Sequence, residues 1–187
     1  MGSIREDPLF RSLNSMEMED DQDRFHQQFI KTAGSTTHLL FNRRQVNDIK
    51  SFCTEFGKSS VLSVDVTFKL GPFWALVTTY QNLILRRKGQ QNHPVMIGPV
   101  ALVKDKTEKS YSHLFKALVS EEPSLSQSLK GSGSDGEINL EKALDSSFQQ
   151  AYRFRCANHL FNDVREKARQ IGLPRATVET CIEELCN

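Results

Sequence analysis

The most regular hydrophobic pattern in the chain is VLSVDVTFKLG at residues 61–71, which predicts a β-strand. Its β-branched and aromatic residues favour a strand, and the pair Gly71-Pro72 ends it. Alternation divides the side chains between two faces, with Leu62, Val64, Val66 and Phe68 on one and Val61, Ser63, Asp65 and Thr67 on the other. Because both faces carry apolar residues, we expect a central strand that is covered on both sides.

Asp65 is the one charged residue in the middle of this strand. A carboxylate in a covered strand is costly unless it is paired, hydrogen-bonded or bound to a metal ion. The alternative interpretation is that Asp65 lies at the end of the strand and caps a turn. The remainder of the chain bears on this choice.

Two further strands follow the first. Residues 73–85, FWALVTTYQNLIL, come directly after the Gly-Pro turn, which predicts an antiparallel hairpin. Residues 95–103, VMIGPVALV, predict a third strand. Pro99 lacks the N–H that a strand ladder needs, so we expect it at a sheet edge or at a bulge.

Apolar residues at spacings of three and four predict helices over 41–56, 110–122, 138–148, 158–171 and 175–185. The first has Asn42 as a candidate N-cap. In the helix over 158–171 the pattern points Leu160, Phe161, Val164 and Ala168 inward and Arg165, Lys167 and Arg169 outward. Residues 152–156 predict a short strand, whereas the Gly-Ser stretch at 131–134 is either a flexible linker or a short strand or turn.

This element order predicts the fold class α/β, with three antiparallel strands and then alternating helices and strands in one mixed sheet. It matches the ribonuclease H-like fold, for which we expect helices on both faces of the sheet. In that fold the third strand is an edge and the first and fourth strands are neighbours. Asp65 on the first strand would then meet Asp135 at the end of the fourth.

Two neighbouring carboxylates repel each other and are held together when divalent cations bridge them. Paired magnesium ions activate a water or a 3′-hydroxyl and stabilise the leaving oxygen of a phosphodiester. The pair Asp65 and Asp135 is therefore a candidate metal and catalytic site. Asp135 has an alternative interpretation of its own, because Ser-Asp-Gly is a common turn sequence.

Composition places the chain among ordinary globular proteins. It has 187 residues, a formal net charge of +1 and 38% hydrophobic residues, enough for one domain with a sizeable core. No apolar run is long enough to span a bilayer, and the N-terminal sequence lacks the apolar segment of a secretory signal. The four irregularly spaced cysteines then predict reduced thiols in an intracellular protein.

Charge is spread unevenly along the chain. Residues 1–29 hold seven acidic and three basic side chains and few aliphatic ones, so we expect residues 1–36 to form a mobile arm, with at most a helical turn or two around residues 23–31. Residues 86–116 and 153–175 are basic. The candidate phosphate-binding residues in these two blocks are Arg86, Arg87, Lys88, Arg153 and Arg155. The alternative is an ordinary solvated face.

A C-x2-H motif is formed by Cys156 and His159. Structural zinc needs four ligands, and no second Cys/His pair lies at a finger-like spacing, so the motif is weak evidence for zinc. The alternative is a buried cysteine followed by a histidine at a helix start.

In this order, the segments VDVTFKLGPFWALVTTY, GPVALVKDKTEKSYSHLF, SDGEINLEKALDSSF and YRFRCANHLFNDVREK resemble the catalytic core of Mutator-like (MULE) transposases. The resemblance covers about residues 62–173. It implies that Asp65 and Asp135 are the first two acids of a DDE triad that binds Mg2+ or Mn2+, with Cys156 and His159 auxiliary. It further implies that the chain binds DNA in the nucleus and that it is able to form homo-oligomers.

The chain departs from the family pattern at the third acid. The glutamate of the triad usually follows the C-x2-H after a helical insertion, and the candidates Glu166, Glu179, Glu183 and Glu184 have no matching context. The family's polar cluster after its G-P motif is replaced here by Val103-Lys104-Asp105, and no zinc-finger domain precedes the core.

These observations predict an acidic arm over 1–36, a transposase-like core over 37–173 that is apparently truncated, and a short terminal helix over 174–187. The functional hypothesis is a transposon-derived DDE-type core for metal-dependent cleavage or transfer of DNA strands. The alternative is a catalytically inactive remnant that binds DNA or protein. Whether the chain is an enzyme depends on whether a third carboxylate reaches the two aspartates.

Overall fold

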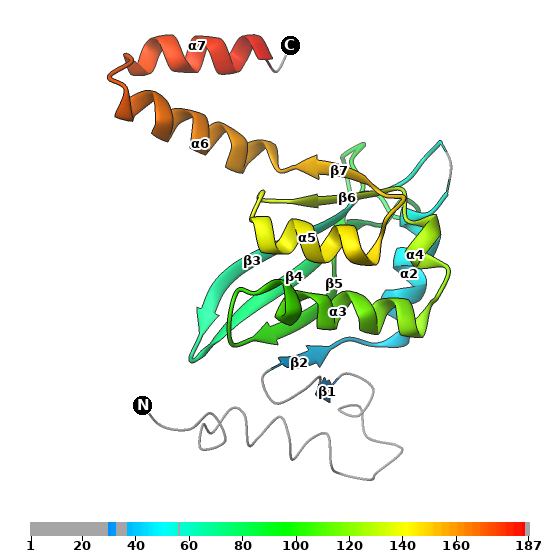
Figure 1. Ribbon diagram of the computed structural model, residues 1–187. Coiled ribbons are helices and arrows are strands. Elements are labelled where there is room, and N and C mark those ends of the chain that lie inside the picture. Colours follow the sequence, from blue (N-terminus) through cyan, green and yellow to red (C-terminus); the bar gives the residue numbers. More distant parts are fainter. Residues whose placement is uncertain (1–29, 33–36, 56, 186–187) are drawn as a thin grey trace.

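The computed structural model describes residues 30–32, 37–55 and 57–185, and its centre is a mixed β-sheet (Figure 1). The strands are β1 (Ile30–Thr32), β2 (Thr37–Leu40), β3 (Leu62–Leu70), β4 (Phe73–Gln81), β5 (Val95–Val103), β6 (Gly131–Ser134) and β7 (Tyr152–Arg155). Over these residues they lie in the order β1-β2-β5-β4-β3-β6-β7. The fold is therefore α/β, as the sequence predicts.

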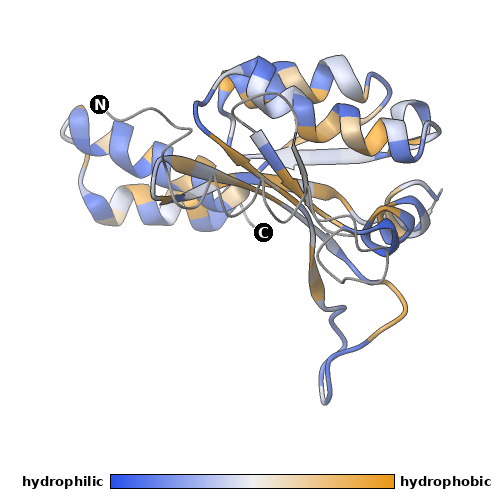
Figure 2. Cartoon of the chain, turned by 90° about the horizontal axis from the view of Figure 1, so that it is seen from below, coloured by the Kyte–Doolittle hydropathy of each residue, from blue (hydrophilic) through white to orange (hydrophobic). Residues whose placement is uncertain are grey.

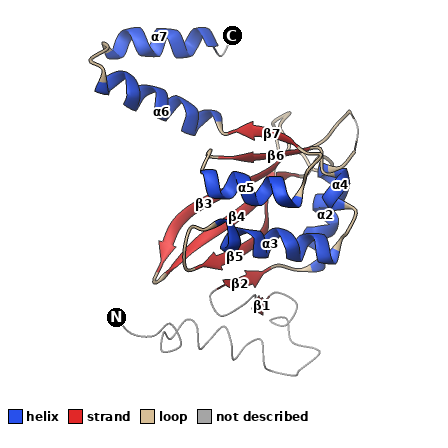
Figure 3. Ribbon diagram, in the orientation of Figure 1, coloured by secondary structure: helices blue, strands red, loops and turns tan. Residues whose placement is uncertain are grey.

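The helices connect and extend this sheet (Figure 3). They are α2 (Arg43–Cys53), α3 (Glu108–Glu121), α4 (Leu125–Ser128), α5 (Ile138–Ser147), α6 (Ala157–Gln170) and α7 (Arg175–Leu185). Asn42 caps α2 as predicted, because its side chain accepts the Gln45 N–H while the Gln45 side chain accepts the Asn42 N–H.

Strands β3, β4 and β5 form the predicted antiparallel meander, whereas β6 runs parallel to both β3 and β7. The Gly-Ser stretch at 131–134 is thus a strand and no flexible linker. Its four residues are buried, and Ser132 lies opposite Leu62 of β3. Small residues suit this position because β7 packs closely: a Cβ at Gly131 would lie 2.7 Å from the Phe154 ring.

The sequence-based expectation that the third strand, β5, is an edge of the sheet is wrong. β5 is no edge, because Thr37–Leu40 pairs with Val100–Val103. Pro99 instead sits where the register between β4 and β5 shifts, and its carbonyl accepts the Thr78 hydroxyl at 2.7 Å. The bulge alternative for Pro99 is therefore confirmed.

β1 arises from the stretch that was expected to be a mobile arm, so the helical turn expected around residues 23–31 is wrong for Ile30 and Lys31. The remainder of that arm, 1–29 and 33–36, lies outside the described residues.

Helices α2, α3 and α5 cover one face of the sheet and enclose a single hydrophobic core with it. Its fully or almost fully buried members include Val46, Ile49, Leu62, Val64, Leu76, Ala101, Tyr111, Leu114, Phe115, Leu140, Leu144 and Phe148. In Figure 3, α3 and α5 lie side by side in front of the strands. The opposite face carries no helix among the described residues and lines an open pocket instead. The expectation of helices on both faces is therefore wrong for the described part of the chain.

Helices α6 and α7 form a hairpin that projects beyond β7, away from the sheet (Figure 1). The hairpin has a small core of its own, made by Ala168, Val178 and Ile182 with Phe161 packed against them. Leu160 and Val164 of α6 are exposed, so their predicted inward orientation is wrong. Over the described residues, no helix combines the length and apolarity that crossing a membrane requires.

Candidate functional site

The site is centred on the first and fourth strands of the predicted order, β3 and β6. Ser63 is paired with Gly133 in their parallel ladder. Asp65 lies two residues beyond Ser63 in β3, and Asp135 lies two residues beyond Gly133, in the turn that directly follows β6. Both aspartates line the same pocket, so the structure brings together the two carboxylates that the sequence singled out.

Asp65 occupies the middle of β3, opposite Val77 of β4, and its side chain is exposed to the pocket. The alternative in which Asp65 caps a turn at the strand end is wrong. Among the described residues its carboxylate accepts no hydrogen bond from a protein donor. Its oxygens are therefore available to a ligand that approaches through the pocket.

Asp135 lies in the turn between β6 and α5. One carboxylate oxygen accepts the Glu137 backbone N–H at 2.9 Å, and Gly136 adopts a φ of 93° that favours glycine. The turn interpretation of Ser-Asp-Gly is therefore confirmed. It does not remove Asp135 from the site, because its other carboxylate oxygen is left for a ligand and the residue lines the pocket.

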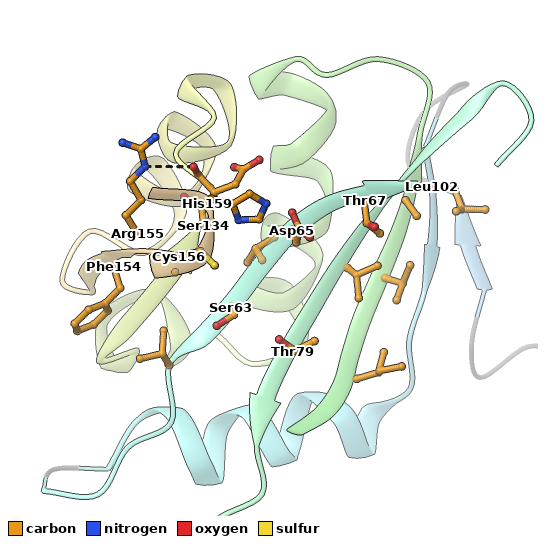
Figure 4. Close-up of a pocket in the computed structure, with 18 of the residues that line it drawn as sticks. Ser63, Asp65, Thr67, Thr79, Leu102, Ser134, Phe154, Arg155, Cys156 and His159 are labelled. Atoms are coloured by element: carbon orange, nitrogen blue, oxygen red, sulfur yellow. Dashed lines mark hydrogen bonds between the residues drawn. The ribbon is translucent and has the colours of Figure 1, made fainter. Parts of the chain in front are cut away.

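Cys156 and His159 lie at the start of α6, on the rim of the same pocket (Figure 4). Cys156 is exposed, so the buried-cysteine alternative is wrong. The backbone N–H of His159 lowers the pKa of the Cys156 thiol, and the thiol beside the ring, followed by the negative charges of Asp65 and Asp135, raises the pKa of His159. Figure 4 shows the His159 ring next to Asp65.

These contacts favour the charged form of His159 more than in a free histidine, and that charge, where present, lies close to both carboxylates. Such a charge partly offsets the repulsion between the two aspartates in the absence of a cation. This arrangement gives the C-x2-H motif an electrostatic effect on the site without requiring zinc.

A second polar group adjoins the site and was missed from the sequence. The Tyr111 hydroxyl donates to both carboxylate oxygens of Glu137, at 2.9 and 3.1 Å, and burial, followed by this bond, raises the pKa of Tyr111. Lys106 lies 3.9 Å from Glu137 and 4.4 Å from the centre of the Trp74 ring. The tyrosine looked like an ordinary core residue in the helical pattern, and only the D-G-E sequence hinted at Glu137.

Among the described residues, the structure brings no third acid to the two aspartates. Glu166 is exposed and accepts hydrogen bonds from Arg169 and Gln170, while Glu179 pairs with Arg165. Within the described residues, no group of three or more His, Cys, Asp or Glu side chains is arranged to hold a metal ion.

The five basic candidates fall into two different environments. Arg86, Arg87 and Lys88 are exposed in the loop between β4 and β5. Arg153 turns inward and bonds to Asp145, Ser132, Ala151 and Phe148, so it connects β6, β7 and the end of α5. Arg155 lines the pocket, where it bonds to the Asp135 backbone carbonyl at 3.4 Å and pairs with Asp163.

The pocket that contains the aspartates is a concave region of about 920 Å3 on the open face of the sheet. Apart from the polar end formed by Asp65, Asp135, Cys156 and His159, its lining is largely apolar, with side chains such as Val77, Val100 and Leu102. The carboxylates thus stand at one end of a hydrophobic groove.

No protein-family model matches the chain, and no curated protein matches it. Its function therefore has to be inferred from the geometry around Asp65 and Asp135.

Proposed function

We propose that this chain is a transposase-derived DDE-type core with a ribonuclease H-like sheet, adapted to hold divalent metal and DNA. The strand order β5-β4-β3-β6-β7, with three antiparallel strands followed by two parallel ones, supports the ribonuclease H-like assignment. The observation that carries the proposal is that Asp65, on β3, and Asp135, directly after the neighbouring parallel strand β6, line one pocket.

The residues present suit a hard divalent cation at least in part. Mg2+ and Mn2+ prefer oxygen ligands, and Mg2+ sites commonly combine one or two carboxylates with waters and substrate phosphates. Asp65 offers a carboxylate without a protein hydrogen bond, and Asp135 offers one oxygen beyond that bonded to Glu137. Such an ion, when bound, supplies Lewis-acid activation and stabilises charge on the phosphodiester.

The chain's own residues then have distinct roles. Asp65, from the middle of β3, and Asp135, from the turn that follows β6, would hold the cation, and the Glu137 N–H fixes the orientation of the Asp135 carboxylate. The exposed bases Arg86, Arg87 and Lys88 are proposed to contact DNA phosphates, which implies a nuclear location. Arg155 stands beside Asp135 and is the candidate for a phosphate contact next to the site.

The test of this function is metal-dependent DNA binding by the full chain. Two carboxylates repel a phosphate unless a cation lies between them, so Mn2+ should tighten binding to labelled duplex DNA in fluorescence anisotropy. Asp65→Asn combined with Asp135→Asn should remove the dependence on Mn2+, while Glu55→Gln, at an exposed position just after α2, should retain it. Wild-type affinity that is identical in Mn2+ and in chelator would contradict the proposal.

The second candidate, an inactive remnant that binds DNA or protein, is favoured by the lack of a third acid among the described residues near the pair. Two carboxylates neutralise half the charge of two divalent ions, so a second ion would be loosely held. A ~1 Å error in placement can cost on the order of a hundredfold in rate. We therefore expect no efficient nicking of supercoiled or branched DNA in Mn2+.

Clear nicking that disappears in Asp65→Asn would exclude the inactive remnant. Its further loss in Glu166→Gln would identify Glu166 as the third acid. The same experiment therefore separates an active core from an inactive one.

A further inference from the structure

Two apolar surfaces of this chain are exposed at the same time. The first is the open groove, the helix-free sheet face lined by Val61, Val77, Ile97, Val100, Leu102 and Phe154. Ile97 is 66% exposed and Phe154 51% exposed. Figure 2 shows the strands largely in the hydrophobic colour. Such a face is favourable only when something covers it.

The second surface is the α6 stripe, formed by Leu160, Val164, Lys167 and Ile171. Leu160, Val164 and Lys167 follow one another at spacings of four and three, so they share one face of α6, and Ile171 continues this face at the C-cap. Leu160, Val164 and Ile171 are 38%, 39% and 66% exposed. The contact with α7 uses a different face of α6, that of Phe161 and Ala168. The α6 stripe is therefore free to dock elsewhere.

The groove has the dimensions of a short helical segment. An α-helix with its side chains is about 10 Å wide and rises 1.5 Å per residue. A volume of about 920 Å3 therefore corresponds to roughly two turns. The part of the α6 stripe from Leu160 to Lys167 rises about 10 Å, which is close to that length.

The two surfaces also match in charge. Lys167 is the one charged member of the α6 stripe, and it forms no ion pair among the residues that the structure describes. The groove has the carboxylates of Asp65 and Asp135 at its polar end. A helix that lays the α6 stripe along the groove would thus bring a lysine toward a pair of acids.

Within one chain, the first turn of α6 borders the groove through His159, and the helix then projects beyond β7, away from the sheet (Figure 1). β7 ends at Arg155 and α6 begins at Ala157, so no loop allows α6 to fold back. The junction is further fixed by the Cys156 N–H bond to the Ser134 carbonyl at 2.8 Å and by the ion pair between Arg155 and Asp163. Among the described residues, the α6 of the same chain cannot reach along the groove, so an α6 that lies in it has to come from another molecule.

We propose that two copies of this chain form a dimer by exchanging their α6–α7 hairpins, so that the α6 stripe of each copy lies in the open groove of the other. The contact is isologous, since each molecule offers one stripe and one groove. It covers both exposed apolar surfaces at once and places Lys167 near the partner's carboxylates. The dimer requires neither metal nor catalysis, and Lys167 would compete with a divalent cation for the same two carboxylates.

The test is sedimentation of the full chain over a concentration series. Val164→Glu changes the stripe and Ile97→Lys changes the groove, and both positions are already exposed, so folding should be retained. Each dimer contains the altered contact twice. A tenfold loss per contact therefore gives a dimer dissociation constant about a hundredfold weaker. The matched controls Ile138→Glu and Ile84→Lys, exposed positions outside both surfaces, should dimerise like the wild type.

Mixing the two variants provides the sharper result. The mixed dimer contains one unaltered contact, from the Ile97→Lys copy's stripe to the Val164→Glu copy's groove, and one contact between Glu and Lys. The mixture should therefore dimerise more tightly than either variant alone.

A wild type that stays monomeric at every concentration would overturn the proposal, as would a dimer unaffected by both variants or a mixture without recovery. A monomer whose melting temperature falls in Val164→Glu would indicate that α6 folds back onto its own groove, which also overturns it.

Discussion

Replacing Arg153 by alanine should destabilise the fold, although the sequence suggested a contact with nucleic acid. The guanidinium donates to Ser132 Oγ at 2.7 Å, to the Phe148 carbonyl at 3.0 Å and to the Ala151 carbonyl at 3.3 Å. It also pairs with Asp145 at 2.6 Å. The Arg153 side chain is only 28% exposed, and these bonds tie β7 to β6 and to the end of α5.

In Arg153→Ala, the acceptors of Ser132, Phe148 and Ala151 lose their donor, and the expected loss in the free energy of unfolding follows from this. A hydrogen bond that involves a charged group contributes roughly 1.5–3 kcal/mol. The exposed pair with Asp145 adds at most about 1 kcal/mol. Water can donate to some of these acceptors in place of the guanidinium, because the site is partly open. The expected loss in the free energy of unfolding is therefore smaller than the sum of these contributions, about 3 kcal/mol.

Urea denaturation of the wild type and of Arg153→Ala measures this difference. Arg153→Lys is the matched variant, since it keeps the charge but has one donor nitrogen where the guanidinium uses three to reach separate acceptors, and it should lie between the two. A loss of less than about 0.5 kcal/mol in Arg153→Ala, the range of ordinary surface substitutions, would refute the structural role of this residue.

Three further predictions follow from other parts of the structure. Phe148→Ala, which empties a fully buried position, should lower the free energy of unfolding by about 3–5 kcal/mol in the same urea assay. Iodoacetamide should alkylate Cys156 before Cys53, because the Cys156 pKa is lowered at an exposed site while burial raises the pKa of Cys53 to about 12; peptide mapping in which Cys53 reacts first would contradict this. Hydrogen bonds from Ser124 and Lys50 lower the pKa of Glu122 to about 2, so its charge should persist below the usual glutamate range and be lost only as the pH falls toward 2. A carbon-detected NMR titration with an ordinary glutamate midpoint would disprove that shift.

From residue 61 onward, the sequence predicted the elements that have a clear period or a Gly/Pro boundary, but it did not predict the short helix α4. The Val-rich β3 and the helical spacing of Leu114 and Leu118 are examples. The strand at 131–134 was left open, since Gly and Ser have little strand preference. Its burial between β3 and β7 decides its conformation, and that is a tertiary effect which no local pattern contains.

The sequence also predicted that Asp65 and Asp135 come together, through the expected neighbours in the sheet. It could not predict what covers the sheet, because apolar residues on both faces of a strand show a need for burial and say nothing about its source. The inward assignment of Leu160 and Val164 failed for the same reason. The role of Arg153 could not be predicted either. The sequence of a basic block is the same whether an arginine in it faces solvent or donates to carbonyl and hydroxyl groups of the fold.

The measurement that tests the central claim most directly is the change in melting temperature of the full chain on addition of Mn2+. A cation that binds only the folded state stabilises it by mass action, so the wild type should melt at a higher temperature in Mn2+ than in chelator. Asp65→Asn combined with Asp135→Asn should abolish the shift, while Glu55→Gln should keep it. An equal melting temperature with and without Mn2+, or a shift that persists in the double variant, would contradict a metal site at these two aspartates.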